Sequence, residues 1–309
     1  MPRRNKSYAI DQCALYRCGT RKKLLQLLQT TPTKLAELKA AGTLYHRMEK
    51  PKKNGGVREV YAPRYDLKRI QTRLSELLMR VEAPDYLMSP VRGRSNIDNA
   101  AAHRNAPSHR LIDIEDFYPS CTAAKVAWFF GKVMDCPPDV VAILVWLTTL
   151  DGALPQGSPA SPILAFLSYR DMWDEIAEIA AKNDNRLTVY VDDVTLSGEV
   201  VLGRTLWEVK GALRKHGHRT KENKEESRYG TPVTVTGVVL RTGVLLLPNV
   251  QHQKRYQLRK ALERMPKGPE RLRTEAALAG HDETERQIAK RFMQVPAVMS
   301  DPFHPPRER

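Results

Sequence analysis

An aspartate interrupts a short apolar stretch at residues 111–114 (LIDI), where a strand would bury its side chains. An unpaired carboxylate is costly to bury, so Asp113 requires either a basic partner or a cation. A second acidic feature, the pair Asp192 and Asp193, lies at the bend of the clearest hairpin in the sequence, residues 187–197. If these two strands are neighbours, three carboxylates converge at one edge of a sheet.

Converging carboxylates indicate metal chemistry when the rest of the sequence supports it. Alone, an acidic pair in a bend is more often ordinary turn chemistry, so Asp192-Asp193 is not sufficient evidence. Together with Asp113 the pair would supply the oxygen ligands that Mg²⁺ prefers and shares with substrate phosphates. Two Mg²⁺ ions can activate an attacking hydroxyl and stabilise a leaving pyrophosphate, and that reaction is nucleotidyl transfer.

The charge balance favours a polyanionic partner. The 309 residues include 50 Lys and Arg against 35 Asp and Glu, a net charge of +15. Residues 1–58 hold 14 basic and 3 acidic residues, so this first fifth of the chain carries 14 − 3 = +11. A solvated basic face is the simpler alternative. Lys and Arg beside phosphates gain affinity by counterion release, however, so we expect nucleic acid binding.

The remaining composition is typical of a folded cytoplasmic protein. Hydrophobic residues make up 41% of the chain and charged residues 28%, which indicates a folded protein, and a length of 309 residues suggests about two lobes. The longest apolar run, residues 140–147, is far shorter than the ~20 residues of a membrane span. The N-terminus has no apolar stretch typical of a signal peptide. Cys13, Cys18, Cys121 and Cys136 lack zinc-site or disulfide spacing, so we expect reduced thiols and no membrane.

Periodicity predicts an α+β protein, because helices alternate with strands that pair as hairpins. Leucine spacing and turn residues mark the elements. The expected helices cover residues 21–29, 32–41, 66–81, 123–134, 139–150 and 205–216, the last opened by a capping box between Thr205 and Glu208. A strand pair is expected at 44–62 around the basic turn 52–56, and two strands at 233–247. From residue 249 the chain is expected to be helical and basic, with a frayed Pro-rich tail at 302–306.

In this setting the sequence resembles a reverse transcriptase. Asp113, Asp192 and Asp193 match the three metal-binding aspartates of that family, and the resemblance adds Ile114 to the metal site. Tyr118 matches the aromatic steric gate that would clash with a ribonucleotide 2′-hydroxyl. The implied cofactor is Mg²⁺, as two ions. The three aspartates therefore carry the catalytic prediction.

Further positions of the resemblance concern the incoming nucleotide. Residues 154–162 (LPQGSPASP) match the Pro-Gln-Gly motif, in which Gln156 shapes the nucleotide and template pocket. Lys53 and Arg58 stand where the fingers contact triphosphate, although Lys52 could replace Lys53. Lys224 resembles the motif lysine near the phosphates and is a candidate general acid for pyrophosphate.

The implied architecture is a right-hand polymerase fold. Fingers and N-terminal basic helices would occupy residues 1–110, with some fingers residues interleaved further on. A palm built on an antiparallel sheet with helices would occupy 111–248, and a short helical thumb with the tail would occupy 249–309. In the thumb, Arg255 and Arg259 could follow RNA shape, and Tyr256 could stack on an unpaired base. A solvated amphipathic helix is an equal alternative for Tyr256.

Two short elements are similar to the bacterial retron branch of the family. Residues 99–103 (NAAAH) match its Asn-Ala-x-x-His element, which suggests template or RNA contacts for Asn99 and His103, and residues 235–237 (VTG) match its Val-Thr-Gly element. The resemblance implies a particular substrate and product. A neighbouring structured noncoding RNA would be copied, from the 2′-hydroxyl of an internal guanosine, into a branched RNA–DNA hybrid (msDNA). It also implies an effector protein partner in antiphage defence.

Two alternatives stay open, and three positions depart from the family pattern. The chain could be a reverse transcriptase of another bacterial lineage, such as the abortive-infection or diversity-generating types. It could also be a non-catalytic scaffold that only binds RNA, although such a protein would not need all three aspartates. Val191 stands where alanine is common, Tyr118 where many retron members have phenylalanine, and Glu225 where threonine is usual. None of these changes removes a metal ligand.

Overall fold

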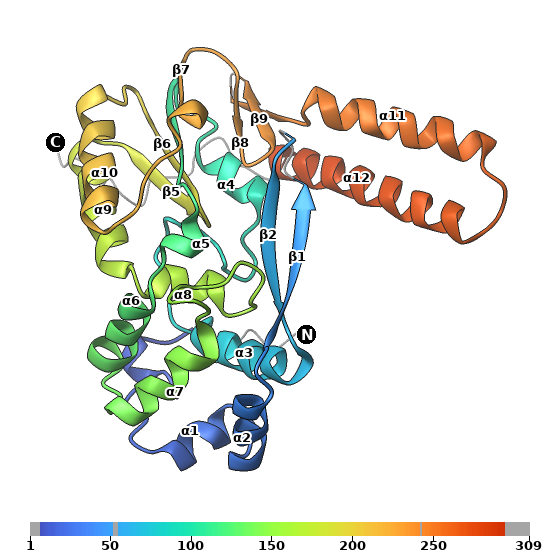
Figure 1. Cartoon of the computed structure of the whole chain (residues 1–309). Helices are drawn as coiled ribbons and strands as arrows, with labels where there is room; N and C mark the ends of the chain where they lie inside the picture. The colour runs from blue at the N-terminus through green and yellow to red at the C-terminus, as the bar shows by residue number, and fades with distance from the viewer. Residues whose placement is uncertain (1–6, 52–54, 242, 294–309) are drawn as a thin grey trace.

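The computed structural model describes residues 7–51, 55–241 and 243–293. A five-stranded sheet lies at the centre with helices packed around it (Figure 1). A long ribbon of two strands and a projecting hairpin of two helices extend from this body (Figure 1). The predicted α+β class is confirmed.

The central sheet has the strand order β3-β5-β6-β4-β7. Its strands are β3 (Leu87–Ser89), β4 (Ser108–Asp113), β5 (Arg186–Tyr190), β6 (Asp193–Gly198) and β7 (Glu226–Tyr229). β4 is antiparallel to β6 and β7, β5 is antiparallel to β6, and β3 joins β5 in parallel. The predicted hairpin is therefore confirmed as β5 and β6. The same pairing confirms that the two predicted acidic strands are neighbours.

Helices cover the sheet on two sides. α9 (Arg170–Lys182) and α10 (Gly203–Lys215) lie along one face, and α4 (Asn96–Ala102) lies on the other side (Figure 1). Because both faces are covered, Val194 to Ser197 of β6 are all buried. The expected cap of the helix at 205–216 is wrong: α10 begins at Gly203 with Leu202 as its N-cap. Thr205 therefore lies inside the first turn, where its side chain is fully buried.

The N-terminal part follows the sequence pattern closely. Thr20 and Thr31 cap the helices α1 (Arg21–Leu27) and α2 (Pro32–Ala40), because each hydroxyl accepts the backbone N–H three residues later. β1 (Tyr45–Pro51) and β2 (Val57–Pro63) form the predicted antiparallel ribbon. α3 (Tyr65–Leu78) then buries its leucine stripe in the core. Residues 52–54 of the basic turn lie outside the described residues.

The lower body is a set of short helices around one core. They are α5 (Phe117–Ser120), α6 (Ala123–Trp128), α7 (Pro138–Thr148) and α8 (Ser161–Leu167). The helix expected over residues 123–134 changes its winding, because a π-helical segment, Phe129–Val133, continues α6. That segment buries Phe129 and Phe130, whose ring centroids are 5.0 Å apart.

The C-terminal part has a small sheet and a helical hairpin. Residues 233–247 contain three strands where two were expected: β8 (Val233–Val235), β9 (Val238–Arg241) and β10 (Val244–Leu246). α11 (Asn249–Arg264) and α12 (Pro269–Met293) confirm the predicted helical region. The tail at 302–306 lies outside the described residues.

Two hydrophobic clusters divide the interior. The large cluster runs through the body from Cys13 to Leu213. The small cluster joins the three-stranded sheet to Ile288 of α12 and to Ile97 and Ala100 of α4. The small sheet and the base of the helical hairpin therefore share a core of their own, which contacts the body through α4 and through Leu111 of β4.

The four cysteines are free and buried, as their spacing predicts. In the part of the chain described by the structure, no helix has the length and apolar character needed to span a membrane.

Candidate active site

The strand pairing brings the three predicted aspartates to one edge of the central sheet. Asp113 is the last residue of β4 and lies directly opposite Asp193, the first residue of β6. Asp192 occupies the bend between β5 and β6, and its carbonyl accepts the N–H of Ile114 at 3.0 Å. All three side chains are half-buried. Backbone hydrogen bonds therefore fix the spacing of the aspartates.

The bend itself is strained at Val191. This residue has φ of 60°, in the left-handed region that β-branched side chains rarely adopt. Such a conformation costs on the order of 1–3 kcal/mol and persists only where neighbouring structure enforces it. The strand pairs on both sides of the bend supply that enforcement. A smaller side chain such as alanine would be less crowded in this conformation than the β-branched Val191.

Two lysines hold the carboxylate of Asp113. Lys221 Nζ lies 2.5 Å from Oδ1, and Lys224 Nζ lies 2.6 Å from Oδ2. The sequence analysis predicted a role near the phosphates for Lys224 but did not identify Lys221. A signal was available, because the two lysines are three residues apart around the 3₁₀ turn Glu222–Lys224, and residues at that spacing lie on one face of such a turn.

Charge crowding perturbs the aspartates of the bend. Burial, followed by the charges of Asp192 and Asp113, raises the pKa of Asp193 to about 7. Burial also raises the pKa of Asp192, with the charge of Asp113 adding to the effect. The hydrogen bond to Asp113 raises the pKa of Lys224. The positive charges of Lys221 and Lys224 therefore compensate only part of the negative charge of the three carboxylates.

The donor set fits a hard divalent cation. It consists of carboxylate oxygens and the nearby Ile114 carbonyl, and Mg²⁺ and Ca²⁺ select such oxygens. Among residues 7–51, 55–241 and 243–293, no group of three or more His, Cys, Asp or Glu side chains stands ready-made as a metal site. The carboxylate of Asp113 is directed at the two lysines. A cation could bind the carboxylate of Asp113 only after at least one of the two lysines has released it.

Tyr118 lies in α5, immediately beyond the aspartate-bearing end of β4. Its neighbour Phe117 packs against Trp173 and His218, with ring centroids 6.3 and 5.7 Å apart. Burial and the charge of Asp192 raise the pKa of Tyr118, so its phenol is a neutral donor near the acidic edge. The packing of Phe117 therefore fixes α5, and Tyr118 on the same helix lies within reach of the charge of Asp192.

The Pro-Gln-Gly loop is attached to the strand ribbon. The carbonyl of Gln156 accepts the N–H of Tyr61 in β2 at 2.7 Å. Gly157 has φ of 116°, and a Cβ on it would lie 2.9 Å from the carbonyl oxygen of Tyr61. Arg58 is exposed on the same strand, whereas Lys53 lies outside the described residues. The loop and the ribbon thus approach each other as closely as glycine allows.

The two elements resembling the retron branch meet in space. The side-chain amide of Asn99 donates to the hydroxyl of Thr236 at 3.2 Å, and that hydroxyl donates to the carbonyl of Asn96 at 2.9 Å. His103 bridges Ser197 and Thr188 of the central sheet, at 2.6 and 2.7 Å. Asn99 and His103 are fully buried. Their observed partners are protein groups, and both residues tie α4 to its neighbours.

The three residues of α11 that were expected to contact RNA differ in their surroundings. Arg255 is buried and forms ion pairs with Asp282 and Glu285 of α12, at 2.6 and 2.7 Å. Arg259 also reaches Asp282, at 3.3 Å, but remains largely exposed. Tyr256 is 65% exposed. Arg255 therefore fastens α11 to α12, while Tyr256 and Arg259 are accessible to a partner.

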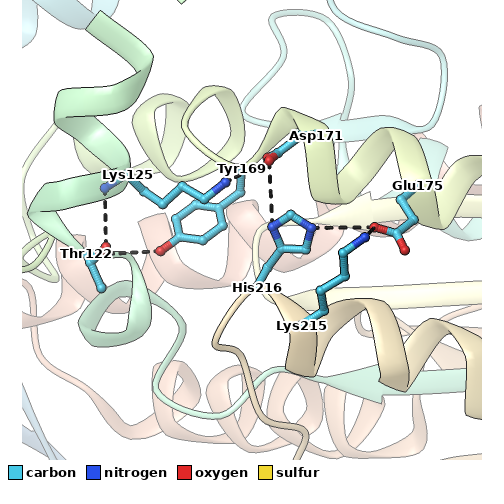
Figure 2. A network of polar contacts seen from close by, with 7 residues as sticks. All are labelled: Thr122, Lys125, Tyr169, Asp171, Glu175, Lys215 and His216. Carbon is cyan, nitrogen blue, oxygen red and sulfur yellow. Dashed lines mark hydrogen bonds and ion pairs between the residues drawn. The ribbon is translucent and has the colours of Figure 1, made fainter. Parts of the chain in front are cut away.

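A polar network behind the site anchors the segment that carries the two lysines. His216, at the end of α10, lies between Asp171 and Glu175 of α9, at 3.7 and 3.5 Å (Figure 2). Lys125 and Lys215 pair with the same two carboxylates (Figure 2). Two residues further, His218 shares a hydrogen bond of 2.8 Å with the hydroxyl of Ser120. Sequence analysis missed this network, because its charges are scattered over three helices.

The buried histidines predict a loss of stability in mild acid. Burial lowers the pKa of His103 to about 3 and that of His218 to about 4, against roughly 6.5 in an unfolded chain. The unfolded state therefore binds more protons below pH 6.5, and at pH 5 each histidine reduces the free energy of unfolding by about 2 kcal/mol. Urea titrations at pH 7, 6 and 5 measure this loss.

A matched pair of variants isolates the effect of the histidine. His103→Gln should remove about half of the pH dependence between 6.5 and 5, because His218 keeps its share, whereas His252→Gln, at an exposed position on α11, should leave it unchanged. A parent-like slope in His103→Gln would show that other groups control the acid response.

Sequence comparison finds relatives among the retron reverse transcriptases. No protein family model matches the chain. The reverse transcriptase of retron Se72 from Salmonella heidelberg is 27% identical over 221 residues, which cover 67% of this chain and 56% of that protein. The retron Mx65 enzyme of Myxococcus xanthus is 29% identical over 62% of this chain and 50% of its own length. The retron Ec86 enzyme of Escherichia coli is 30% identical over 50% and 48%. The chain thus spans about half the length of these relatives.

Two of the solved structures that match parts of the chain do so with TM-scores below 0.5. The foamy viral protease-reverse transcriptase in complex with double-stranded DNA matches with a TM-score of 0.44 and 16% identity, covering 82% of this chain and 41% of that one. Apo telomerase from Candida tropicalis matches with a TM-score of 0.47 and 12% identity, covering 66% and 55%.

Proposed function

Since the chain is a relative of the bacterial retron reverse transcriptases, we propose that it is an RNA-directed DNA polymerase. The observation that carries the proposal is the pairing of Asp113 with Asp193 beside Asp192 at one sheet edge. Three carboxylates in this position have an evident use in nucleotidyl transfer, and two of them have raised pKa values that a cation would relieve. A scaffold for RNA would gain nothing from such crowding.

The acidic edge would hold the metal cofactor. Asp113, Asp192 and Asp193, with the carbonyl of Ile114, would bind two Mg²⁺ ions. When bound, these ions would activate the primer hydroxyl and stabilise the departing pyrophosphate. The chain's own contribution is to keep the carboxylates in register through β4 and β6 and to limit access of water by half-burying them.

Other residues would receive the nucleotide and its phosphates. Lys224 would act near the triphosphate, where its ammonium, protonated at neutral pH, would serve as a proton donor to pyrophosphate. Arg58, and Lys53 beyond the described residues, would contact the triphosphate from the ribbon. Gln156 would shape the nucleotide and template pocket through the loop fastened to Tyr61. Tyr118 would act as the steric gate that excludes nucleotides with a 2′-hydroxyl.

The nucleic acid would extend toward the helical hairpin. Tyr256 and Arg259 are exposed on α11 and are suited to stacking on a base and to contacting phosphates. We assign Asn99 and His103 an indirect role, because both are buried and join α4 to Thr236 and to the central sheet. The net charge of +15 would supply affinity along the whole path.

The template and product are the finer part of the proposal. We propose that the chain copies a cognate structured noncoding RNA into single-stranded DNA, starting from the 2′-hydroxyl of an internal guanosine. The support is the meeting of residues 99–103 with residues 235–237, since both elements resemble the retron branch. The branched msDNA would remain bound, and an effector protein would complete an antiphage defence system.

Purification with the native RNA tests the proposal. The gene is expressed with its flanking DNA, and nucleic acid bound to the protein is sequenced before and after RNase treatment, with Asp192→Asn in parallel. A discrete DNA joined to RNA, missing in the variant, is the expected result. Extension of an added primer without such a DNA would favour another bacterial lineage of the family. RNA binding without any synthesis would indicate the scaffold.

Sugar selection provides a prediction for Tyr118. Its ring follows directly on Phe117, which is locked between Trp173 and His218, so the ring has a fixed position. Tyr118→Ala should remove the clash with a 2′-hydroxyl and raise ribonucleotide incorporation by about tenfold to a hundredfold. Single-nucleotide extension with dNTP and rNTP measures the ratio.

Tyr118→Phe is the matched control for this prediction. It keeps the ring and removes only the hydroxyl, so selectivity should stay close to that of the parent. If Tyr118→Ala leaves the dNTP/rNTP ratio unchanged, the steric gate lies at another residue.

A further inference from the structure

The ammonium of Lys221 contacts two oxygens that the proposed function assigns to a metal ion. Its Nζ atom lies 2.5 Å from Oδ1 of Asp113 and 3.5 Å from the carbonyl oxygen of Ile114. These are the donor atoms contributed by the β4 side of the site. Lys221 therefore occupies the space in which a cation bound to both oxygens would have to sit.

The backbone around Lys221 keeps its side chain near this place. The N–H of Lys221 donates to the carbonyl of Asp113 at 2.9 Å, and Glu115 donates to the carbonyl of Arg219 at 2.8 Å. Thr220 forms an isolated antiparallel bridge with Ile114. Residues 219–221 thus extend the sheet by a short paired segment. Only rotation of the long side chain can remove the ammonium from Asp113.

Lys224 provides a contrast on the same carboxylate. It binds Oδ2 of Asp113 at 2.6 Å, its side chain is 51% exposed against 26% for Lys221, and no contact to Ile114 is found for it in the described part of the chain. Lys224 therefore approaches from solvent. Lys221 lies deeper and between two ligand atoms.

We propose that Lys221 is an internal counter-ion that takes the place of a divalent cation at Asp113 and Ile114, so that cation binding must displace its ammonium. The inference rests on the proposed polymerase function, because that function supplies the cation. An ammonium is a compact cation with three donors, and it satisfies the same hard oxygens that Mg²⁺ selects. Lys221 is thus a positioning residue that keeps Asp113 oriented before the cation arrives and sets the cation affinity of the site.

Cation binding without nucleotide or RNA tests this inference. Mn²⁺ is titrated into the full chain, and free Mn²⁺ is measured by electron paramagnetic resonance. Lys221→Gln removes the competing cation, and the dissociation constant should fall about tenfold, as loss of one charge-assisted contact predicts. Lys221→Arg keeps the positive charge and should restore affinity close to that of the parent.

Two controls separate displacement from a general charge effect. Lys224→Gln removes the same charge from the same carboxylate and should tighten Mn²⁺ binding clearly less than Lys221→Gln. In an Asp113→Asn background the effect of Lys221→Gln should disappear, because the shared ligand is gone. Equal tightening in the two lysine variants, or unchanged affinity in Lys221→Gln, would overturn the proposal.

The result is independent of the test of the proposed function. Primer extension by the unaltered chain reports whether it is a polymerase, and the Mn²⁺ titration reports whether Lys221 competes with a cation. Extension without a change of affinity in Lys221→Gln refutes only the role of Lys221. Failure of extension by the unaltered chain refutes the polymerase.

Discussion

Replacing Asp192 by Asn should reduce DNA synthesis by about a thousandfold, because the site would lose about 4 kcal/mol of transition-state stabilisation. Asp192 lies in the bend between β5 and β6, and its carbonyl is held by the N–H of Ile114. An asparagine keeps that backbone contact and the shape of the side chain, but it has no charge to hold a cation. Primer extension on an RNA template at several Mg²⁺ concentrations measures the loss.

Two further measurements distinguish lost chemistry from lost structure. RNA binding by Asp192→Asn should be retained or slightly tighter, since a negative charge is removed. Its thermal stability at neutral pH should be equal to or above that of the parent, because burial raises the pKa of Asp192 and ionisation is therefore unfavourable in the folded state. Clear extension activity in this variant would refute the assignment of Asp192 to the metal site.

Replacing Gly157 by Ala should damage both stability and activity. At φ of 116° only glycine is comfortable, and the added Cβ would lie 2.8 Å from Val60 Cγ1 and 2.9 Å from the Tyr61 carbonyl. We expect a loss of about 3 kcal/mol in the free energy of unfolding. Displacement of the loop that carries Gln156 by even 1 Å should lower extension by about a hundredfold. Urea titration and primer extension test the two effects.

Gly211→Ala is the matched control. Gly211 lies inside α10 with no atom within 4 Å of an added Cβ. An alanine there should stabilise the helix by up to about 1 kcal/mol and leave extension unchanged. If Gly157→Ala behaves like Gly211→Ala, the close approach of the loop to β2 is not essential.

The acidic edge could be predicted because its signals are local. An aspartate in an apolar strand and a pair of aspartates in a hairpin bend are visible in a few residues each. Whether the two strands are neighbours was left open by the sequence, and the pairing of β4 with β6 answers it. The helices that begin at Arg21 and Pro32 and the β1–β2 ribbon are local in the same way. The cap expected at Thr205 is wrong because a threonine followed by a glutamate three residues later can also lie inside a helix, as Thr205 and Glu208 do here.

The partners of polar and charged side chains could not be predicted, because they depend on contacts between distant segments. Lys221 and Asp113 are 108 positions apart, and Asn99 and Thr236 are 137 apart. Arg255 was assigned to RNA from its place in a basic stretch, but Asp282 and Glu285 hold it across the helical hairpin. Helix periodicity shows which residues share a face, but it does not reveal which opposite charge the next helix brings.

The separate core of the small sheet has a mechanical consequence. Because β8, β9 and β10 pack with Ile288 of α12 in a core separate from the large one and contact the body through α4 and Leu111 of β4, we expect this unit to open and close as one cooperative piece while the large core stays intact. Amide hydrogens of α11 and α12 should then exchange together and well before those of β5 and β6. If the proposed function holds, such independent opening would loosen the contacts of α11 and α12 with a duplex. The enzyme could then advance by one base pair while the carboxylates keep their geometry.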